Sequence, residues 1–207
     1  MLYLNHRESD VTVLGPGHRY VIWVQGCRRC CKGCVFPEGQ LLGKNGYWIT
    51  SGQLLQEIQT AKQPLTGITI SGGEPFLQPA GMAELIGLLR ENTKLDIMVY
   101  TGYTLQELQQ QDNANVNYIL NNIDLLIDGE YIEELNNNKI YRGSDNQQIW
   151  FLSDKYLPFK EKMENTCNRS LEFVFRNGEV FTVGLPAKNF QRDFWQAMEK
   201  RQQKIKE

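Results

Sequence analysis

The sequence predicts a mixed α/β fold, and two features of the residue pattern support this class. Short apolar stretches rich in β-branched residues alternate with segments whose apolar residues recur at helical spacing. The connections between them are short, which is typical of parallel strands joined by helical crossovers. From the residues alone the sheet can be open or curled toward a barrel, and in both cases ligands bind at the carboxyl ends of the strands.

Four strands are predicted along the chain, at Tyr20–Val24, Gly67–Ser71, Leu95–Tyr100 and Asp124–Ile127. After the first strand, a Thr50/Ser51 cap precedes a helical face of Leu54, Leu55, Ile58 and Ala61. After the second strand, a helical face is formed by Met82, Leu85, Ile86 and Leu89. Thr104-Leu105-Gln106-Glu107 has the form of a capping box and predicts the start of a third helix.

The C-terminal part of the chain has a different pattern. Asn177-Gly178, a strong hairpin signal, separates the predicted strands Leu171–Arg176 and Glu179–Val183. A terminal helix, expected to pack on the core or else to bind a partner, is predicted by Phe190, Phe194 and Met198. We interpret the Asn- and Gln-rich segment Gln109–Asn122 as a solvated loop.

Charge and hydropathy exclude several classes of function. The chain carries 22 basic and 24 acidic residues, a net charge of −2, so we expect no broad basic face for binding nucleic acid. No apolar run approaches the roughly 20 residues that a membrane span needs, and the N-terminus lacks a signal peptide's apolar stretch. We therefore expect a cytoplasmic protein without membrane or nucleic-acid partners.

Four of the five cysteines lie close together, at Cys27, Cys30, Cys31 and Cys34. An intracellular chain rarely uses disulfides, so the cluster indicates a chemical role. As C-x2-C-C-x2-C it offers four thiolates, which suggests zinc, although zinc sites usually space their two cysteine pairs more widely. As C-x3-C-x2-C, with Cys27, Cys31 and Cys34, it offers three thiolates and would leave one iron of a 4Fe–4S cluster open.

The second interpretation resembles the radical S-adenosylmethionine (SAM) enzymes, in particular the glycyl-radical-enzyme activases and anaerobic ribonucleotide reductase activating proteins. The similarity covers roughly residues 13–150 and consists of motifs in family order. Besides the cysteine loop, these motifs are Gly15-Pro16-Gly17-His18-Arg19, Gly72-Gly73-Glu74-Pro75, Tyr100-Thr101-Gly102-Tyr103-Thr104, Asp124-Leu125-Leu126-Ile127-Asp128-Gly129 and Arg142-Gly143-Ser144-Asp145-Asn146-Gln147.

The resemblance implies a fold and a domain organisation. It implies a partial (β/α)6-type barrel of parallel strands over residues 1–165, with a C-terminal β-hairpin and helix extension, residues 166–207, packed on the same domain. It also implies two cofactors, a 4Fe–4S cluster on Cys27, Cys31 and Cys34, and SAM bound to the fourth iron. Reductive cleavage of SAM would then give a 5′-deoxyadenosyl radical.

The resemblance also assigns roles to individual SAM-binding residues. Glu74 would accept from the cofactor's ammonium, with Gly72 and Gly73 permitting close approach and Pro75 completing the turn. The methionine or ribose side would be lined by Thr101 and Gly102. Asp128 would accept from a hydroxyl or the ammonium, and Arg142 would pair with the cofactor's carboxylate or form a structural salt bridge.

Basic residues lie beside the thiols. Arg28, Arg29 and Lys32 are expected either to lower the thiol pKa values or to be the surface charges of a solvated loop.

Three functions remain open at this point. The first is activation of a separate glycyl radical enzyme, with reduced flavodoxin or ferredoxin as electron donor. The second is radical SAM chemistry on a small molecule or a ribosomal peptide, as in the 7-carboxy-7-deazaguanine synthases and peptide maturases. The third is a non-catalytic zinc-binding module that uses all four clustered cysteines.

Overall fold

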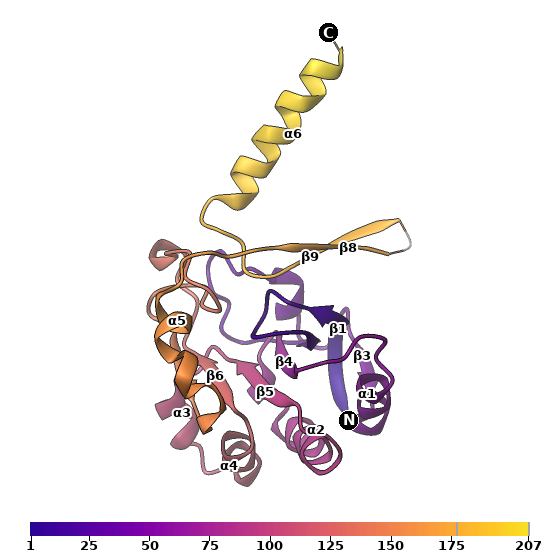
Figure 1. Ribbon diagram of the computed structural model, residues 1–207, viewed down its shortest axis with the longest axis vertical. Helices are drawn as coiled ribbons and strands as arrows, with labels where there is room; N and C mark the ends of the chain where they lie inside the picture. Colours follow the sequence, from indigo (N-terminus) through magenta and orange to yellow (C-terminus); the bar gives the residue numbers. More distant parts are fainter. Residues whose placement is uncertain (177, 207) are drawn as a thin grey trace.

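The computed structural model describes residues 1–176 and 178–206, without the side chains of 191, 195 and 202–206. A seven-stranded sheet in the order β3-β1-β2-β4-β5-β6-β7 forms its centre (Figure 1). Four central strands are parallel, namely β2 (Arg19–Val24), β4 (Gly67–Gly72), β5 (Asp96–Tyr100) and β6 (Leu125–Asp128). They match the four predicted strands, which confirms the α/β class and the parallel centre of the sheet.

Three strands that flank the parallel centre of the sheet are antiparallel to their neighbours and were not predicted: β1 (Leu2–Val11), β3 (Tyr47–Ile49) and β7 (Gln148–Phe151). β1 lacks a clear strand pattern because polar residues follow its buried Leu2 and Leu4. The described part of the chain thus contains four parallel strands where the expected (β/α)6-type barrel would have six. Its sheet is open, since the edge strands β3 and β7 do not pair with each other.

Four helices cover one face of this sheet, namely α1 (Ser51–Gln59), α2 (Pro79–Asn92), α3 (Leu105–Gln109) and α4 (Ala114–Asn121). Capping boxes start α1 and α3, where the side chains of Thr50 and Thr104 accept hydrogen bonds from backbone N–H groups. Both predicted caps are therefore confirmed.

Helix α4 lies in the segment Gln109–Asn122 that we expected to be a solvated loop. The Asn113 side chain caps it by accepting from the Asn115 N–H at 3.0 Å, and Val116 and Ile119 are fully buried. The loop prediction was wrong because a cap and two buried residues hold this short polar helix on the core.

Side chains of the central strands alternate between the two faces of the sheet. In β5, Ile97 and Val99 pack among the helices, whereas Met98 faces the other side. There it contacts the cluster that contains Tyr156 of η4 (Asp154–Phe159) and Met163 of α5 (Lys160–Asn165). The second face is therefore covered by later, shorter elements.

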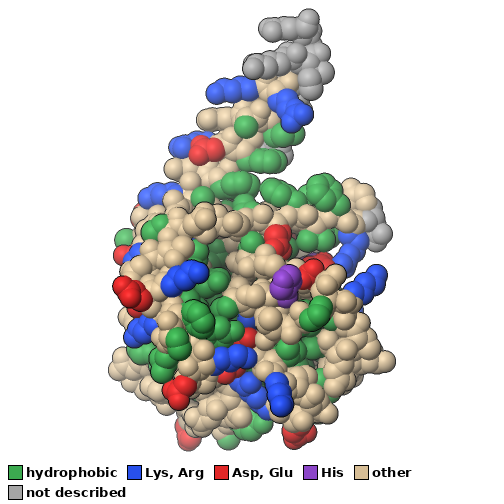
Figure 2. All heavy atoms as spheres, in the orientation of Figure 1, with side chains coloured by type: hydrophobic (Ala, Val, Ile, Leu, Met, Phe, Trp, Pro, Cys, Tyr) green, Lys and Arg blue, Asp and Glu red, His purple; other side chains and the backbone are tan. Residues whose placement is uncertain are grey.

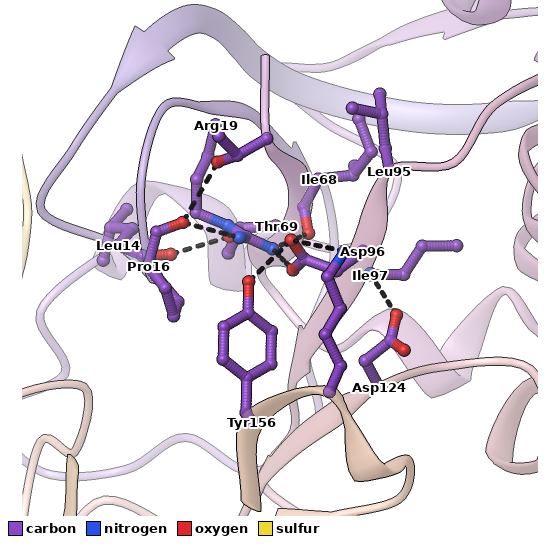
Figure 3. Close-up of polar contacts among 12 residues, drawn as sticks. Leu14, Pro16, Arg19, Ile68, Thr69, Leu95, Asp96, Ile97, Asp124 and Tyr156 are labelled. Carbon is purple, nitrogen blue, oxygen red and sulfur yellow. Dashed lines mark hydrogen bonds and ion pairs between the residues drawn. The ribbon is translucent and has the colours of Figure 1, made fainter. Parts of the chain in front are cut away.

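A buried ion pair joins the amino ends of the parallel strands (Figure 3). Arg19 of β2 donates from Nη2 to Asp96 Oδ1 at 2.7 Å and from Nε to Thr69 Oγ1 at 2.5 Å. The Tyr156 hydroxyl donates to the other Asp96 oxygen at 2.8 Å.

A Cβ on Gly15, whose φ is +137°, would lie 2.5 Å from Arg19 Cδ. This glycine-rich motif therefore makes room for a structural arginine, at the opposite end of the sheet from the cysteines.

The predicted C-terminal hairpin is present as β8 (Glu172–Arg176) and β9 (Glu179–Val183), although Asn177 of its turn lies outside the described residues. On its inner face Val183 is buried with Val11 of β1, and Arg176 pairs with Glu8 at 2.9 Å. The outer face is apolar and exposed, and Figure 2 shows hydrophobic side chains gathered along it; its exposed residues include Phe173, Phe175 and Val180.

Helix α6 (Phe190–Lys206) extends away from the sheet (Figure 1), and Met198 is 40% exposed. The sequence of this helix is rich in charged and amide residues, in keeping with its projection from the sheet. The domain division at residues 165 and 166 stays a prediction. Within the described ranges, no helix combines the length and the apolar character that crossing a membrane requires.

Candidate functional site

The cysteine loop follows β2 at the carboxyl edge of the parallel strands. Backbone N–H groups of Gly26 and Cys27 donate to carbonyls of the 3₁₀ helix η1 (Pro37–Gln40) at 2.8 and 3.2 Å. The buried Gln25 side chain donates to a further carbonyl of this segment at 2.9 Å. These bonds fix both ends of the loop, so the cysteines between them are held at the edge of the sheet.

Three of the clustered cysteines face one pocket, and the fourth does not. Cys27, Cys31 and Cys34 line this pocket, whereas Cys30 is exposed and is not part of the lining. The Cys31 thiol is close enough to Cys27 and Cys34 to be influenced electrostatically by both. The structure therefore favours the C-x3-C-x2-C interpretation.

The pKa values of two of these thiols, Cys27 and Cys31, move in the opposite direction from the one expected. Burial raises the pKa of Cys31 to about 11 and also raises the pKa of Cys27. The neighbouring cations are engaged elsewhere, since Arg29 pairs with Glu107 at 3.2 Å and Lys32 pairs with another glutamate at 3.3 Å. The prediction of lowered pKa values was wrong for these two thiols because it counted adjacent charges and could not include burial.

The Gly72-Gly73 turn at the end of β4 lies directly against the cysteine loop. Gly72 has φ +106°, and a Cβ on it would lie 2.4 Å from the backbone of Val24. A Cβ on Gly73 would lie 2.2 Å from the carbonyl oxygen of Gly26. The two glycines are therefore required by contact between two backbone segments, and this contact brings the next residue, Glu74, beside the cysteines.

The Glu74 carboxylate is buried, only 1% exposed, and accepts three hydrogen bonds. Oε1 accepts from the Phe76 N–H at 3.0 Å and the Thr101 hydroxyl at 2.8 Å, and Oε2 accepts from the Gly102 N–H at 2.8 Å. Burial raises the pKa of Glu74. No ion pair with Glu74 is found among the described residues. From the described residues Oε2 accepts one hydrogen bond, so it can accept a second from a cationic donor in the pocket. Glu74, Thr101 and Gly102 all line this pocket.

Asp128 and Arg142 do not line this pocket, in contrast to the roles that the resemblance implied. Asp128 Oδ2 accepts from the Leu105 N–H, at the start of α3, at 2.6 Å. Arg142 donates to the carbonyls of Gln147 and Glu164, each at 3.1 Å, and forms no ion pair within the described residues. Both side chains therefore join backbone segments. Pro75, at the start of the 3₁₀ helix η2 (Pro75–Leu77), is buried and also outside the lining.

Comparisons with known proteins show the family of this chain. The 4Fe-4S single cluster domain family matches residues 13–150 of the chain. The anaerobic ribonucleoside-triphosphate reductase-activating protein of Haemophilus influenzae is 35% identical over 160 residues, which cover 72% of this chain and 97% of that protein. This chain belongs to the family of these reductase-activating proteins.

A second relative with the same name gives the same result. The protein of the same name from Enterobacteria phage T4 is 32% identical, over 69% of this chain and 89% of its own. Among solved structures, the crystal structure of QueE from Escherichia coli is similar to this chain with a TM-score of 0.44 and 20% identity. The similarity covers 50% of this chain and 53% of QueE, about half of each. Family membership confirms a radical SAM, 4Fe–4S enzyme of the glycyl-radical-activating type.

A four-cysteine zinc site is not formed in the part of this activating protein that the structure describes. There, no three His, Cys, Asp or Glu side chains are arranged to bind one metal ion. A 4Fe–4S cluster has a different requirement, since each thiolate binds a different iron of the cluster. The match to a 4Fe-4S single cluster domain over residues 13–150 favours the iron–sulfur interpretation over the zinc module.

The pocket contains lining residues that sequence reasoning did not select, among them Gln147 and Leu185. The Gln147 side chain bonds the backbone of Gly143 and Gly129, both at 2.7 Å. Gln147 is the last residue of the motif that begins at Arg142. Within this motif the charged arginine is the more obvious candidate for binding a cofactor, so sequence reasoning favoured Arg142 over Gln147. Leu185 had none, since it lies beyond residue 150, where the family match ends.

Proposed function

We propose that this protein activates an anaerobic ribonucleoside-triphosphate reductase, the enzyme for which its relatives are named. The observation that carries the proposal is the convergence on one pocket of three thiols and a buried carboxylate that has no ionic partner among the described residues. The open sheet would act as the partial barrel around this pocket, which lies at the carboxyl ends of β2, β4 and β5.

The cofactor-binding roles follow from the lining of the pocket. Cys27, Cys31 and Cys34 would hold a 4Fe–4S cluster and leave one iron without a protein ligand. Glu74 would bind the ammonium of SAM, because a buried anion is stabilised by a cation that it can hydrogen-bond. When bound, the cluster and SAM together supply a 5′-deoxyadenosyl radical that abstracts a hydrogen atom.

Other residues of the pocket orient the Glu74 carboxylate and limit the access of water. Thr101 and Gly102 hold both of its oxygens, and Val35 and Leu185 contribute apolar surface to the lining. Such a lining protects a reactive species from solvent. We further propose that reduced flavodoxin or ferredoxin supplies the electron. We also propose that the protein acts in the cytoplasm.

Electron paramagnetic resonance tests the proposed function. The reconstituted protein, given SAM, reduced flavodoxin and the anaerobic reductase of the same organism, should produce a glycyl radical on the reductase. Deuterium transfer from a small molecule or peptide into 5′-deoxyadenosine, with no glycyl radical on the reductase, would instead support the small-molecule or peptide alternative.

Glu74→Gln is expected to weaken SAM binding by roughly one to two decades. The substitution removes the charge that would meet the ammonium, a loss of roughly 1.5–3 kcal/mol for a buried charged hydrogen bond. Equilibrium binding of SAM to the reconstituted variant measures the effect, with Glu91→Gln, an exposed change on α2, as control. Equal affinity of the Glu74 variant and the parent would show that Glu74 is not the ammonium partner.

Asp128→Ala is expected to lower the free energy of unfolding by roughly 1.5–3 kcal/mol while leaving SAM affinity within about twofold. The reason is that Asp128 accepts from the Leu105 N–H and does not line the pocket. Urea unfolding and SAM binding are measured on the same preparation. A tenfold loss of affinity at unchanged stability would return Asp128 to the cofactor site.

A further inference from the structure

A second cavity, of about 770 Å³, adjoins the cofactor pocket. The two cavities are neighbours, since five residues line both: Cys31, Cys34, Val35, Gln40 and Tyr131. The outer wall of the second cavity is formed by Pro186, Ala187, Lys188 and Asn189 of the linker between β9 and α6, and by Phe190 and Arg192 at the start of α6. We call this cavity the linker groove. Its outer wall lies beyond residue 150, where the family match ends.

Arg169 holds the linker in position. Its Nη1 donates to the Pro186 carbonyl at 2.9 Å and to Asn136 Oδ1 at 3.0 Å. Its Nη2 and Nε donate to backbone carbonyls of residues 139–143, so all five N–H donors have oxygen acceptors. The linker is also joined to this region through the Lys188 N–H, which donates to the Asn138 side chain at 2.9 Å. The linker groove is therefore a built part of the fold.

The lining of the linker groove suits a polypeptide better than an anion. Its charged side chains balance, since Glu133 and Glu134 are matched in number by Lys188 and Arg192. Amide groups that can bond a peptide backbone and apolar surface make up much of the remainder, as in Gln40, Asn189, Val35, Pro37, Pro186 and Ala187. Its volume also lies within the range of about 300–1,000 Å³ that is usual for binding sites.

We propose that the linker groove receives an extended segment of the partner protein, the segment that carries the glycine to be activated. This inference rests on the proposed function. The glycine Cα–H bond would break, its hydrogen atom would form a C–H bond at C5′ of the deoxyadenosyl radical, and the unpaired electron would stay on the glycine Cα. The two carbons must come into van der Waals contact, and the linker groove borders the cofactor pocket along residues that line both.

Ala187→Trp tests this proposal, because Ala187 is exposed in the groove wall and lies outside the lining of the cofactor pocket. A tryptophan there should obstruct the linker groove. We expect glycyl radical formation on the reductase to fall at least about tenfold, with visible cluster absorption and partner-free SAM cleavage within about twofold of the parent. Ala80→Trp, an exposed change on α2 that lines neither cavity, should leave all three measurements unchanged.

The possible outcomes separate the groove from the proposed function. Undiminished activation by Ala187→Trp would overturn the groove assignment alone, and loss of SAM cleavage as well would show that the groove serves only the cofactor. If the parent itself forms no glycyl radical on the reductase, the proposed function is wrong and the docking assignment falls with it. Independently, a photocrosslinking p-benzoylphenylalanine in place of Ala187 should react with the glycine-bearing segment, and reaction only elsewhere on the reductase would overturn the proposal.

Discussion

Replacing Cys27, Cys31 or Cys34 with alanine is expected to abolish cluster assembly and, with it, all SAM cleavage. Each of these thiols lines the pocket, whereas Cys30 and Cys167 are exposed and lie outside its lining. No other thiol is therefore in place to substitute for a missing ligand. After anaerobic reconstitution, the parent should bind about four irons and four sulfides and absorb in the visible region, and each variant should lose both signals.

Cys30→Ala is the matched control, since it removes a thiol from the same loop without changing the pocket lining. Iron content, sulfide content and 5′-deoxyadenosine release should stay close to those of the parent. Loss of the cluster in this variant would contradict the three-cysteine assignment. A colourless protein that keeps stoichiometric zinc in air would contradict the iron–sulfur site itself.

Asp96→Asn is expected to lower the free energy of unfolding of the cluster-free protein by about 3–5 kcal/mol. The Arg19 and Asp96 side chains are both 0% exposed, so removing the carboxylate charge leaves a buried guanidinium without its counterion (Figure 3). The substitution also weakens the acceptor of the Tyr156 hydroxyl. Urea-induced unfolding of the cluster-free protein, followed by circular dichroism, gives the free energy directly.

A surface pair provides the comparison for this effect. Lys160 and Glu164 form an i,i+4 pair whose side chains are 54% and 37% exposed. Glu164→Gln should therefore change the free energy of unfolding by less than about 1 kcal/mol. A similarly small effect of Asp96→Asn would show that the buried pair contributes little to holding the strand ends together.

The sequence by itself determined those features that depend on residues near one another in the chain. The four parallel strands follow from short apolar runs, and the start of α3 follows from Thr104 and Glu107 at capping-box spacing. The spacing of Cys27, Cys31 and Cys34 indicated a three-thiol site, which the pocket lining supports. Local geometry is sufficient in these cases, because each signal joins residues within one turn, strand or loop.

Only the tertiary structure decided which distant residues share the site. Glu74 meets Gly102 because β4 and β5 are neighbours, whereas Asp128, at the end of the next strand, bonds the start of α3. Leu185 reaches the pocket through the C-terminal hairpin, and burial reverses the expected change in the pKa of Cys31. Strand order and burial arise from the packing of the whole chain, so residue spacing carries no direct record of them.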